Sequence, residues 1–447
     1  MRLPRVDRSF GKWFIPGMHI KRWLLLLLFG VAIMGLGFGY FLREVYLFYT
    51  FPSEVYYLTL QFLPRYVRGA LFVGLSASVI LFAIWQLNRS LLSAFLRPGS
   101  DESLVNIIYN HRYLRRGPKI VAIGGGTGLS TLLRGLKEHT GNLTAVVTVA
   151  DDGGSSGRLR EELGLHPPGD LRNCIAALAD AEPLMTRLFQ YRFSEGSGLE
   201  GHSFGNLFIA AMSAVTGNFE DAVRETSRVL AVRGQILPST LESVSLSAVT
   251  HDNESIHGES QITSRGSRIK EVFIHPGNVQ ANPDAIRAIL EADMVVVGPG
   301  SLFTSVLPNL LVDGIRRAIE MSKTVKVYVC NVATERGETD TFAVSDHSQV
   351  LYEHVHDQLF HYIIANSNIS TNGVAEAQAT EPVRIDGSQV QGTAVIAADV
   401  VSEDNRYYHD AAKLAKAVMD LYYQRRQPDQ LSPVTAREPE AQEAAAF

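Results

Sequence analysis

The sequence is poor in cysteine, which limits how the protein can be stabilised. Only two cysteines occur in 447 residues, Cys174 and Cys330, and each lies inside an apolar run. The sequence therefore argues against a disulfide scaffold and favours a reducing, cytoplasmic location. A zinc site is not expected either, because it would need several Cys and His residues at close spacing.

Charged residues are also scarce. They make up 19% of the chain, against ~25% in average soluble domains. The formal net charge is −5, so the chain has no basic excess, and we expect no nucleic-acid partner. A chain of 447 residues exceeds what one hydrophobic core usually fills, which predicts more than one structural unit.

Two long uncharged runs lie near the amino terminus, at residues 23–42 and 70–87. Each is close to the ~20 residues that a helix needs to cross a membrane. Neither run shows a polar face, so we prefer spanning helices to the alternative of buried core helices. Basic residues concentrate before the first run and after the second. The pattern predicts a transmembrane hairpin in the cell membrane, with the large domain and both termini in the cytoplasm.

The composition divides the rest of the chain into further parts. A basic amino terminus and a polar linker flank the hairpin, and a tail rich in Pro, Glu, Gln and Ala ends the chain without periodicity. The predicted boundaries are 1–22 for the basic terminus, 23–88 for the hairpin, 89–117 for the linker, 118–426 for a nucleotide-binding α/β domain and 427–447 for a disordered tail.

The domain opens with a short β-rich run at residues 119–123, a glycine cluster and a helical pattern at residues 129–136. Strand, glycine turn and helix begin a nucleotide-binding βαβ unit. Similar apolar runs follow at residues 143–149, 292–297 and 325–329. This alternation predicts a Rossmann-like, doubly wound and mostly parallel sheet.

Unusual polar clusters follow these predicted strands. They read GGGTGLS, ADDGGSSGRLR, GPGSLFTS and CNVATERGET in chain order. In doubly wound sheets, ligands bind at the carboxyl ends of the strands. We therefore expect these four clusters to surround one binding site.

The first cluster, residues 124–129, is the expected phosphate loop. Its glycines allow a phosphate to approach the backbone, and the following helix offers unpaired N–H groups. Leu129 stands where a dinucleotide fingerprint has its third glycine, and no G-K-[ST] follows, so neither the NAD fingerprint nor a Walker loop fits. An ordinary tight turn is the alternative.

The second cluster carries carboxylates, hydroxyls and a cation. Asp151 and Asp152 are candidates for holding Mg²⁺, a ribose hydroxyl or a substrate hydroxyl, or they cap the next helix. Ser155, Ser156 and Arg158 suit an anion.

Four further residues have more than one interpretation each. Asn173 can bind a ligand or tie down its loop, and His202, which precedes the helix containing Asn206, is an acid/base group, a phosphate donor or a structural histidine. Asp170 is an N-cap or a functional carboxylate. Phe303 can stack on a base or pack in the core. We find no nucleophile paired with a base, so the catalytic residues are unknown.

Taken together, the motifs resemble the bacterial gluconeogenesis factor family, which is related to the 2-phospho-L-lactate transferases. The resemblance rests on GGGTGLSTLLRGLK, TAVVTVADDGGSSGRLREELG, PPGDLRNCIAALAD, GHSFGNLFIAAM, VRGQILP, GPGSLFTSVLPNLLV and CNVATERGET, in this order. It covers about residues 119–423 and leaves out the predicted hairpin.

The resemblance implies a domain that binds UDP-sugars such as UDP-N-acetylglucosamine, with dinucleotides such as NAD as a second, disfavoured class. It also implies a role in carbon metabolism, cell-wall synthesis and cell shape. The phosphate contacts implied by the motif are Gly125, Gly126, Thr127 and Gly128, with Asp151 and Asp152 near the substrate and Gly300, Ser301 and Phe303 beside the nucleotide.

We therefore expect a nucleotide-binding regulator more than an enzyme. The alternatives are a phospholactate-type transferase that uses Mg²⁺, a less favoured NAD-binding oxidoreductase, and a structural anchor with a vestigial site. The expected partners are the nucleotide, the membrane, cell-wall synthesis proteins and further copies of the chain.

Overall fold

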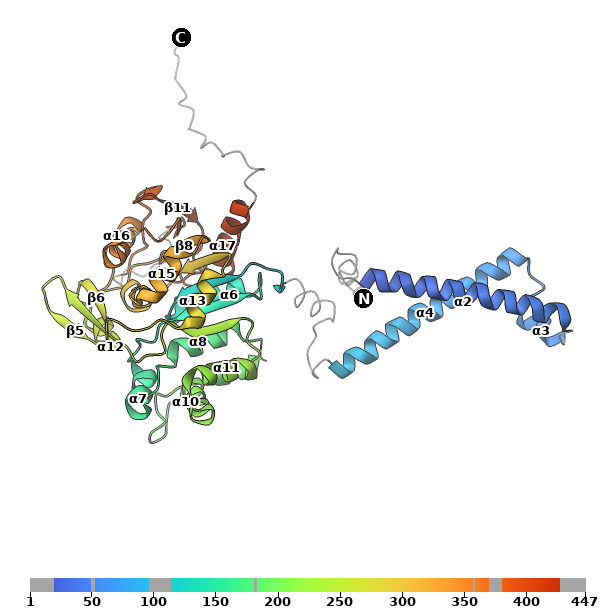
Figure 1. The fold of residues 1–447 in the computed structure, drawn as a ribbon, viewed down its shortest axis with the longest axis horizontal. Coiled ribbons are helices and arrows are strands. Elements are labelled where there is room, and N and C mark those ends of the chain that lie inside the picture. Colours follow the sequence, from blue (N-terminus) through green and yellow to red (C-terminus); the bar gives the residue numbers. More distant parts are fainter. Residues whose placement is uncertain are drawn as a thin grey trace, which may run out of the picture. The chain divides into compact units, whose positions relative to one another are not determined.

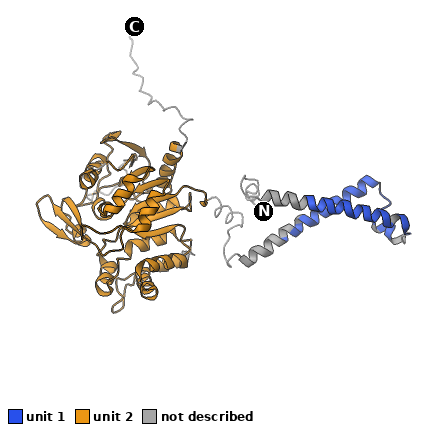
Figure 2. Ribbon diagram, viewed as in Figure 1, with its two compact units in different colours: residues 1–113 blue, residues 114–447 orange. Residues whose placement is uncertain are grey.

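The computed structural model describes residues 20–49, 53–95, 114–180, 183–356, 358–369 and 380–426. The chain separates into two compact units, Met1–Tyr113 and Leu114–Phe447 (Figure 2). The predicted tail at 427–447, most of the basic terminus and most of the linker lie outside the described residues.

The first unit is helical. It contains α2 (Ile20–Phe48), α3 (Ser53–Leu58) and α4 (Arg65–Phe95), so both long uncharged runs form helices. Over the described residues, however, none of the helices combines the length and the apolar character that a membrane crossing requires. The predicted transmembrane hairpin, with spans at about 23–42 and 70–87, is therefore wrong. The cell-membrane location and the topology derived from these spans are wrong for the same reason.

The second unit is built on an eight-stranded sheet in the order β10-β11-β9-β8-β7-β1-β2-β3. Every pairing is parallel except that of β10 with β11. The strands are β1 (Ile120–Gly124), β2 (Leu143–Val147), β3 (Gln235–Pro238), β7 (Met294–Val297), β8 (Val325–Val329), β9 (Tyr362–Asn366), β10 (Gln389–Val390) and β11 (Thr393–Ala398). The predicted Rossmann-like sheet is thus confirmed.

The strand order reverses beside β1. Starting from β1, the chain first adds β2 and β3 on one side, and then returns to add β7, β8 and β9 on the other. The loops after β1 and β7 therefore diverge and leave a crevice at the carboxyl ends of the strands, where such sheets bind ligands. β1 and β7 are buried along their whole length, which explains their unbroken apolar sequences.

Helices connect the strands and carry the loops that matter for the site (Figure 1). They are α6 (Gly126–Leu136), α7 (Gly154–Leu163), α8 (Gly169–Leu178), α9 (Pro183–Gln190), α10 (Phe204–Thr216), α11 (Phe219–Val229), α12 (Glu259–Arg265), α13 (Pro283–Leu290), α14 (Leu307–Leu310), α15 (Asp313–Met321), α16 (Val344–Val355) and α17 (Ala411–Arg426). A short π-helical segment, η1 (Leu302–Val306), precedes α14.

A small antiparallel sheet was not predicted. It consists of β4 (Ser245–Thr250), β5 (Ser255–His257) and β6 (Ile269–His275) and lies at one side of the unit together with α12 (Figure 1). Its inward side chains, such as Leu246, Ala248 and Val272, join the main core. The sheet matters for function because α12, which follows β5, brings Glu259 towards the crevice.

Candidate functional site

A cavity of about 750 Å³ lies at the point where the strand order reverses. Its walls come from the loops after β1, β7 and β8, from α12, and from the segment between β11 and α17. The lining includes Gly125, Gly126, Thr127, Gly128 and Thr131; Pro299, Gly300, Ser301, Thr304 and Ser305; Asn331, Glu335, Arg336 and Glu338; Glu259 and Thr263; and Asn405, Tyr407, Tyr408 and His409. Six predicted binding residues are thus brought together here.

The glycines of the first loop have different structural roles. A Cβ atom at Gly125 would lie 2.5 Å from Asp170 Oδ2, and one at Gly128 would lie 2.5 Å from the Pro299 carbonyl oxygen. Gly125 lets the loop after β1 pack closely on the start of α8, and Gly128 lets the start of α6 pack closely on the loop after β7. Gly126 instead has φ +64°, and a Cβ atom there would meet Ser305 Oγ at an ordinary 3.6 Å, so this glycine is required for the backbone conformation at the start of α6.

Carboxylates line another part of the cavity. Ser301 Oγ donates a hydrogen bond to Glu338 Oε2. Asn331 bridges two loops: its Nδ2 donates to Glu335 Oε1 at 3.1 Å, and its Oδ1 accepts from the Gly300 backbone at 3.2 Å. The loop after β7 is therefore held in place by side chains that follow β8.

These carboxyl groups hold protons unusually well. Burial, together with the charges of Asp151, Asp152 and other nearby carboxylates, raises the pKa of Glu259 to about 8. Burial and the neighbouring Glu338 raise the pKa of Glu335 to about 8. Near neutral pH both groups are largely protonated, so they can donate hydrogen bonds and repel an anionic ligand less than ionised carboxylates would.

Asp151 and Asp152 mainly organise the loop after β2. Asp151 Oδ1 accepts from the Gly153 backbone at 2.8 Å, and Asp152 Oδ1 accepts from the Ser260 backbone at 2.8 Å at the start of α12. Burial raises the pKa of Asp151. Within the described part of the chain, no group of three or more His, Cys, Asp or Glu residues is arranged to hold a metal ion.

Three predicted residues form a buried network away from the cavity lining. Ser155 Oγ lies 3.0 Å from His202 Nδ1 and accepts a hydrogen bond from Asn206 Nδ2 at 3.0 Å. All three are less than 5% exposed. Burial and the charge of Arg158 lower the pKa of His202. The network joins α7 to the start of α10, and its role is therefore structural. It contains a Ser–His pair, Ser155 and His202, that could not be placed from sequence.

The remaining predicted residues lie elsewhere in the unit. Arg158 donates to the Glu200 carbonyl at 2.7 Å beside a separate open hollow. Asn173 accepts from Arg172 at 2.9 Å, and Ser156 bonds to Asp151. The Phe303 ring is fully buried and meets His354 edge-on, with centroids 6.2 Å apart. Phe303 therefore packs in the core, and its ring does not line the cavity.

Sequence reasoning missed several cavity residues. Glu335 and Glu338 lie inside a cluster that was recognised, but their carboxylates were not singled out. Glu259, Tyr407, Tyr408 and His409 come from segments without a glycine motif. The only local signal was the polar and aromatic run NRYYHD before a helix.

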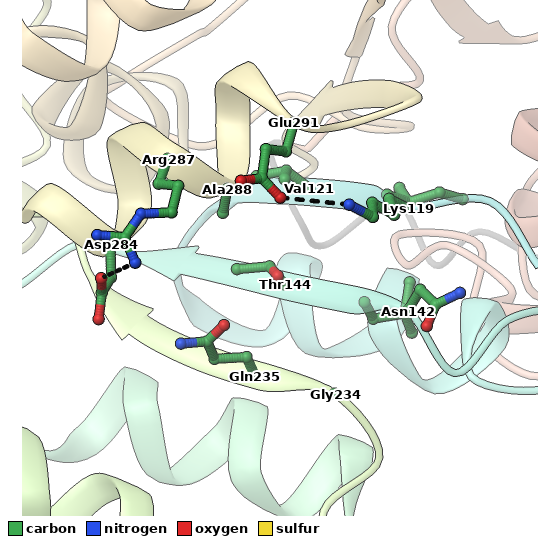
Figure 3. A pocket seen from close by; sticks show the side chains of 12 residues that line it. Lys119, Val121, Asn142, Thr144, Gly234, Gln235, Asp284, Arg287, Ala288 and Glu291 are labelled. Carbon is green, nitrogen blue, oxygen red and sulfur yellow. Dashed lines mark hydrogen bonds and ion pairs between the residues drawn. The ribbon is translucent and has the colours of Figure 1, made fainter. Parts of the chain in front are cut away.

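A second cavity of about 350 Å³ lies at the opposite, amino ends of β1, β2 and β3, beside α13. Figure 3 shows its charged side chains bonded to one another. Lys119 Nζ lies 3.2 Å from Glu291 Oε2, and Arg287 lies 3.0 Å from Asp284. These charged side chains of the cavity are therefore already paired with one another.

Comparisons with known proteins identify the family. The family described as 2-phospho-L-lactate transferase CofD matches residues 120–401. A "Putative gluconeogenesis factor" from Nostoc is 46% identical over 430 residues, which cover 94% of this chain and 93% of that protein. The gluconeogenesis factor of Bacillus subtilis is 47% identical over 310 residues, which cover 68% of this chain and 98% of that protein.

A solved structure supports the same assignment. A crystal structure of a protein from Bacillus halodurans has a TM-score of 0.64 at 43% identity, and the match covers 68% of this chain and 99% of that chain. Some relatives therefore match nearly the full length of this chain, and others match it only over about two thirds. The chain belongs to the gluconeogenesis factor family, whose domain is related to that of the 2-phospho-L-lactate transferases.

Proposed function

We propose that this protein is a regulator that binds a nucleotide-sugar, in particular a UDP-sugar. The observation that carries the proposal is the cavity at the strand-order reversal, into which the glycine turn at the start of α6 opens. The diphosphate lies at this turn, because the first turn of a helix offers N–H groups and the positive end of the helix dipole. The cavity volume of about 750 Å³ falls within the ~300–1,000 Å³ of ordinary small-molecule sites.

The side chains around the turn suit the hydroxyl groups of a sugar better than they suit a further anionic group. Glu259, Glu338 and Ser301 offer oxygen atoms for hydroxyl groups. NAD is disfavoured because Leu129 replaces the third glycine of the dinucleotide fingerprint and is itself fully buried.

A regulatory role fits both the geometry and the relatives. The Ser155–His202 pair is buried among α7 and α10 and is not part of the cavity lining. Several close relatives are named gluconeogenesis factors. We therefore propose that the bound nucleotide-sugar signals the state of carbon metabolism to cell-wall synthesis and cell shape, through contacts with cell-wall synthesis proteins.

The second candidate is a transferase of the phospholactate type. It is favoured by the family match over residues 120–401 and by the carboxylates beside the crevice. The described carboxylates do not fit a Mg²⁺ site as they stand, because Asp151 and Asp152 are engaged by backbone N–H groups and no suitable cluster is formed. We therefore derive no metal-dependent step for this chain.

Thermal unfolding of the full-length protein tests both candidates. UDP-N-acetylglucosamine, NAD, GTP and a deazaflavin are compared, each with and without Mg²⁺. A ligand at a hundred times its dissociation constant adds ~2.7 kcal/mol to the stability, so UDP-N-acetylglucosamine should raise Tm by several degrees. Absence of that shift would overturn the nucleotide-sugar proposal, and a shift with the deazaflavin in its place would favour the transferase.

Two variants locate the binding site. Gly126→Val should abolish the ligand-dependent shift, because a side chain with φ +64° distorts the turn and fills the approach to the phosphate. Lys119→Ala, at the other cavity, is the control and should keep the full shift. Equal shifts in both variants would place the ligand elsewhere.

A further inference from the structure

The segment 405–409 closes part of the cavity with aromatic side chains. It lies between β11 and α17, and Asn405, Tyr407, Tyr408 and His409 all contribute to the lining. Tyr408 is 56% exposed, and Tyr407 is partly buried against the core. Two tyrosines and a histidine beside a phosphate-binding turn form a surface on which a planar ring can stack.

The backbone of this segment is held in place. The Ser402 N–H donates to the Tyr408 carbonyl at 2.9 Å, and the Tyr408 N–H donates to the Asn405 carbonyl at 3.1 Å. Val401 and His409 form an isolated β-bridge. The segment therefore presents its rings without first having to become ordered, which lowers the cost of binding.

The packing of α17 places this segment beside α6. A Cβ atom at Gly135 of α6 would lie 1.9 Å from the Ala411 carbonyl oxygen, at the first residue of α17. The loop that carries Ser301 packs on the beginning of α6, since a Cβ atom at Gly300 would lie 3.2 Å from the Gly125 carbonyl oxygen. The helix that follows the aromatic segment thus packs on α6 near Gly135, whereas the loop with Ser301, which bonds to Glu338, packs at the beginning of α6.

His409 stands at the end of this segment, next to α17. Both ring nitrogens are buried, and neither makes a hydrogen bond of normal geometry within the described part of the chain. Burial lowers the pKa of His409 to about 4, despite the nearby Val400 backbone. The ring is therefore neutral near pH 7 and adds no charge to the aromatic end of the cavity.

We propose that Tyr407, Tyr408 and His409 form the nucleobase subsite, with the base stacked on the tyrosine rings and His409 beside them. The diphosphate then lies at Gly126, and the sugar lies against Glu259 and Glu338. This inference rests on the proposed function and specifies the orientation of the ligand in the cavity. The aromatic end recognises the base, and the carboxylate end recognises the hydroxyl-rich group.

Calorimetric titration of the full-length protein tests the subsite. The probes are UDP-N-acetylglucosamine, UDP and inorganic pyrophosphate, which lacks a base. Loss of one stacking partner weakens nucleotide binding by roughly 5- to 150-fold. Tyr408→Ala and Tyr407→Ala should therefore each weaken the binding of UDP and UDP-N-acetylglucosamine by such a factor. The affinity for pyrophosphate should stay unchanged. Tyr408→Phe, which keeps the ring, should restore binding.

The other end of the cavity supplies the reciprocal test. Glu338→Gln should weaken the binding of UDP-N-acetylglucosamine. The affinity for UDP should change by less than about twofold, because UDP lacks the second sugar. Thermal unfolding without ligand shows whether each variant is folded. Unchanged affinity of Tyr408→Ala and Tyr407→Ala for UDP would overturn the subsite and leave the proposed function intact.

The two proposals fail in distinguishable ways. If the wild-type protein binds ADP or GDP but no UDP-sugar, the proposed ligand is wrong, and the tyrosine variants still report on base stacking with those nucleotides. If no nucleoside diphosphate binds better than pyrophosphate, the nucleobase subsite is wrong together with the proposed function.

Discussion

The two ends of the same parallel sheet carry two very different cavities. At the amino ends of the strands, Lys119, Asp284, Arg287 and Glu291 neutralise one another in ion pairs (Figure 3). At the carboxyl ends, the cavity contains the first turn of α6, protonated carboxyl groups and the neutral ring of His409. A hollow alone therefore does not indicate a binding site.

The physical reason lies in the direction of the strands and helices. In a parallel sheet the helices begin at the carboxyl ends of the strands, so their N–H groups and positive dipole ends point to that side. At the amino ends the helices finish, and α13 covers its neighbouring strands with side chains that pair along the helix. Four tests can break or sharpen this comparison.

The largest expected effect concerns Phe303, which lies under the carboxyl-end cavity. Its ring is fully buried, so Phe303→Ala should lower the free energy of unfolding by ~3–5 kcal/mol. Urea unfolding measures this loss, and Phe303→Leu, which leaves a smaller void, should lose less. If Phe303→Ala instead kept its stability but lost the UDP-sugar, the ring would belong to the binding site.

The two neighbouring glycines should separate stability from binding. Gly128→Ala forces a Cβ atom to within 2.5 Å of the Pro299 carbonyl oxygen, and such overpacking costs ~1–3 kcal/mol. Gly126→Ala has room but keeps φ +64°, which costs ~1–2 kcal/mol. We expect the ratio of lost ligand affinity to lost stability to be larger for Gly126→Ala than for Gly128→Ala. Urea unfolding and calorimetry on both variants check this, and an identical ratio would contradict distinct roles.

The buried carboxyl groups should make stability depend on pH. The pKa of Glu259 is about 8 in the folded protein, against an ordinary 4.5. Between these values the folded state holds a proton that the unfolded chain has lost, so the free energy of unfolding falls as the pH rises from about 5 to 8. Glu259→Gln should reduce this slope by at most ~1.4 kcal/mol per pH unit.

Urea unfolding at several pH values measures the slope. Glu254→Gln is the control, because Glu254 is exposed, and it should leave the slope unchanged. A slope that is the same in wild type and Glu259→Gln would show that Glu259 ionises normally.

The smallest effect is expected at the amino-end cavity. Lys119 and Glu291 are each more than half exposed, and such surface pairs contribute ~0.2–1 kcal/mol. A double-mutant cycle with Lys119→Ala and Glu291→Ala should therefore give a coupling energy within that range. Any change in nucleotide affinity in these variants would mean that the amino-end cavity also takes part in binding.

The predictions from sequence succeeded where the signal was local. The run at residues 119–123, the glycines and the helical pattern predicted β1 and α6, because burial and backbone freedom are properties of neighbouring residues. The transmembrane hairpin failed although α2 and α4 both form. A low charge content predicted helices there, but it did not establish the combined length and apolarity that a membrane span requires.

The second polar cluster shows the limit of motif reading. Ser155 and Arg158 were expected to bind an anion because their types and spacing suit one. In the structure Ser155 bonds to His202 and Asn206 inside the unit, and Arg158 bonds to a carbonyl. A polar side chain can satisfy its hydrogen bonds with the protein or with a ligand, and spacing along the chain does not distinguish the two outcomes.

The sequence by itself determined the family, the alternating strands and helices, and the glycine turn at Gly126, since each depends on short-range patterns. Only the tertiary structure decided which side chains share the cavity. Glu259 arrives from α12 beside a small sheet, and Tyr408 arrives from the segment before α17, far along the chain from β1. Their proximity follows from the strand order and from the packing of α17 on α6. Such long-range contacts depend on the whole core, and no single segment encodes them.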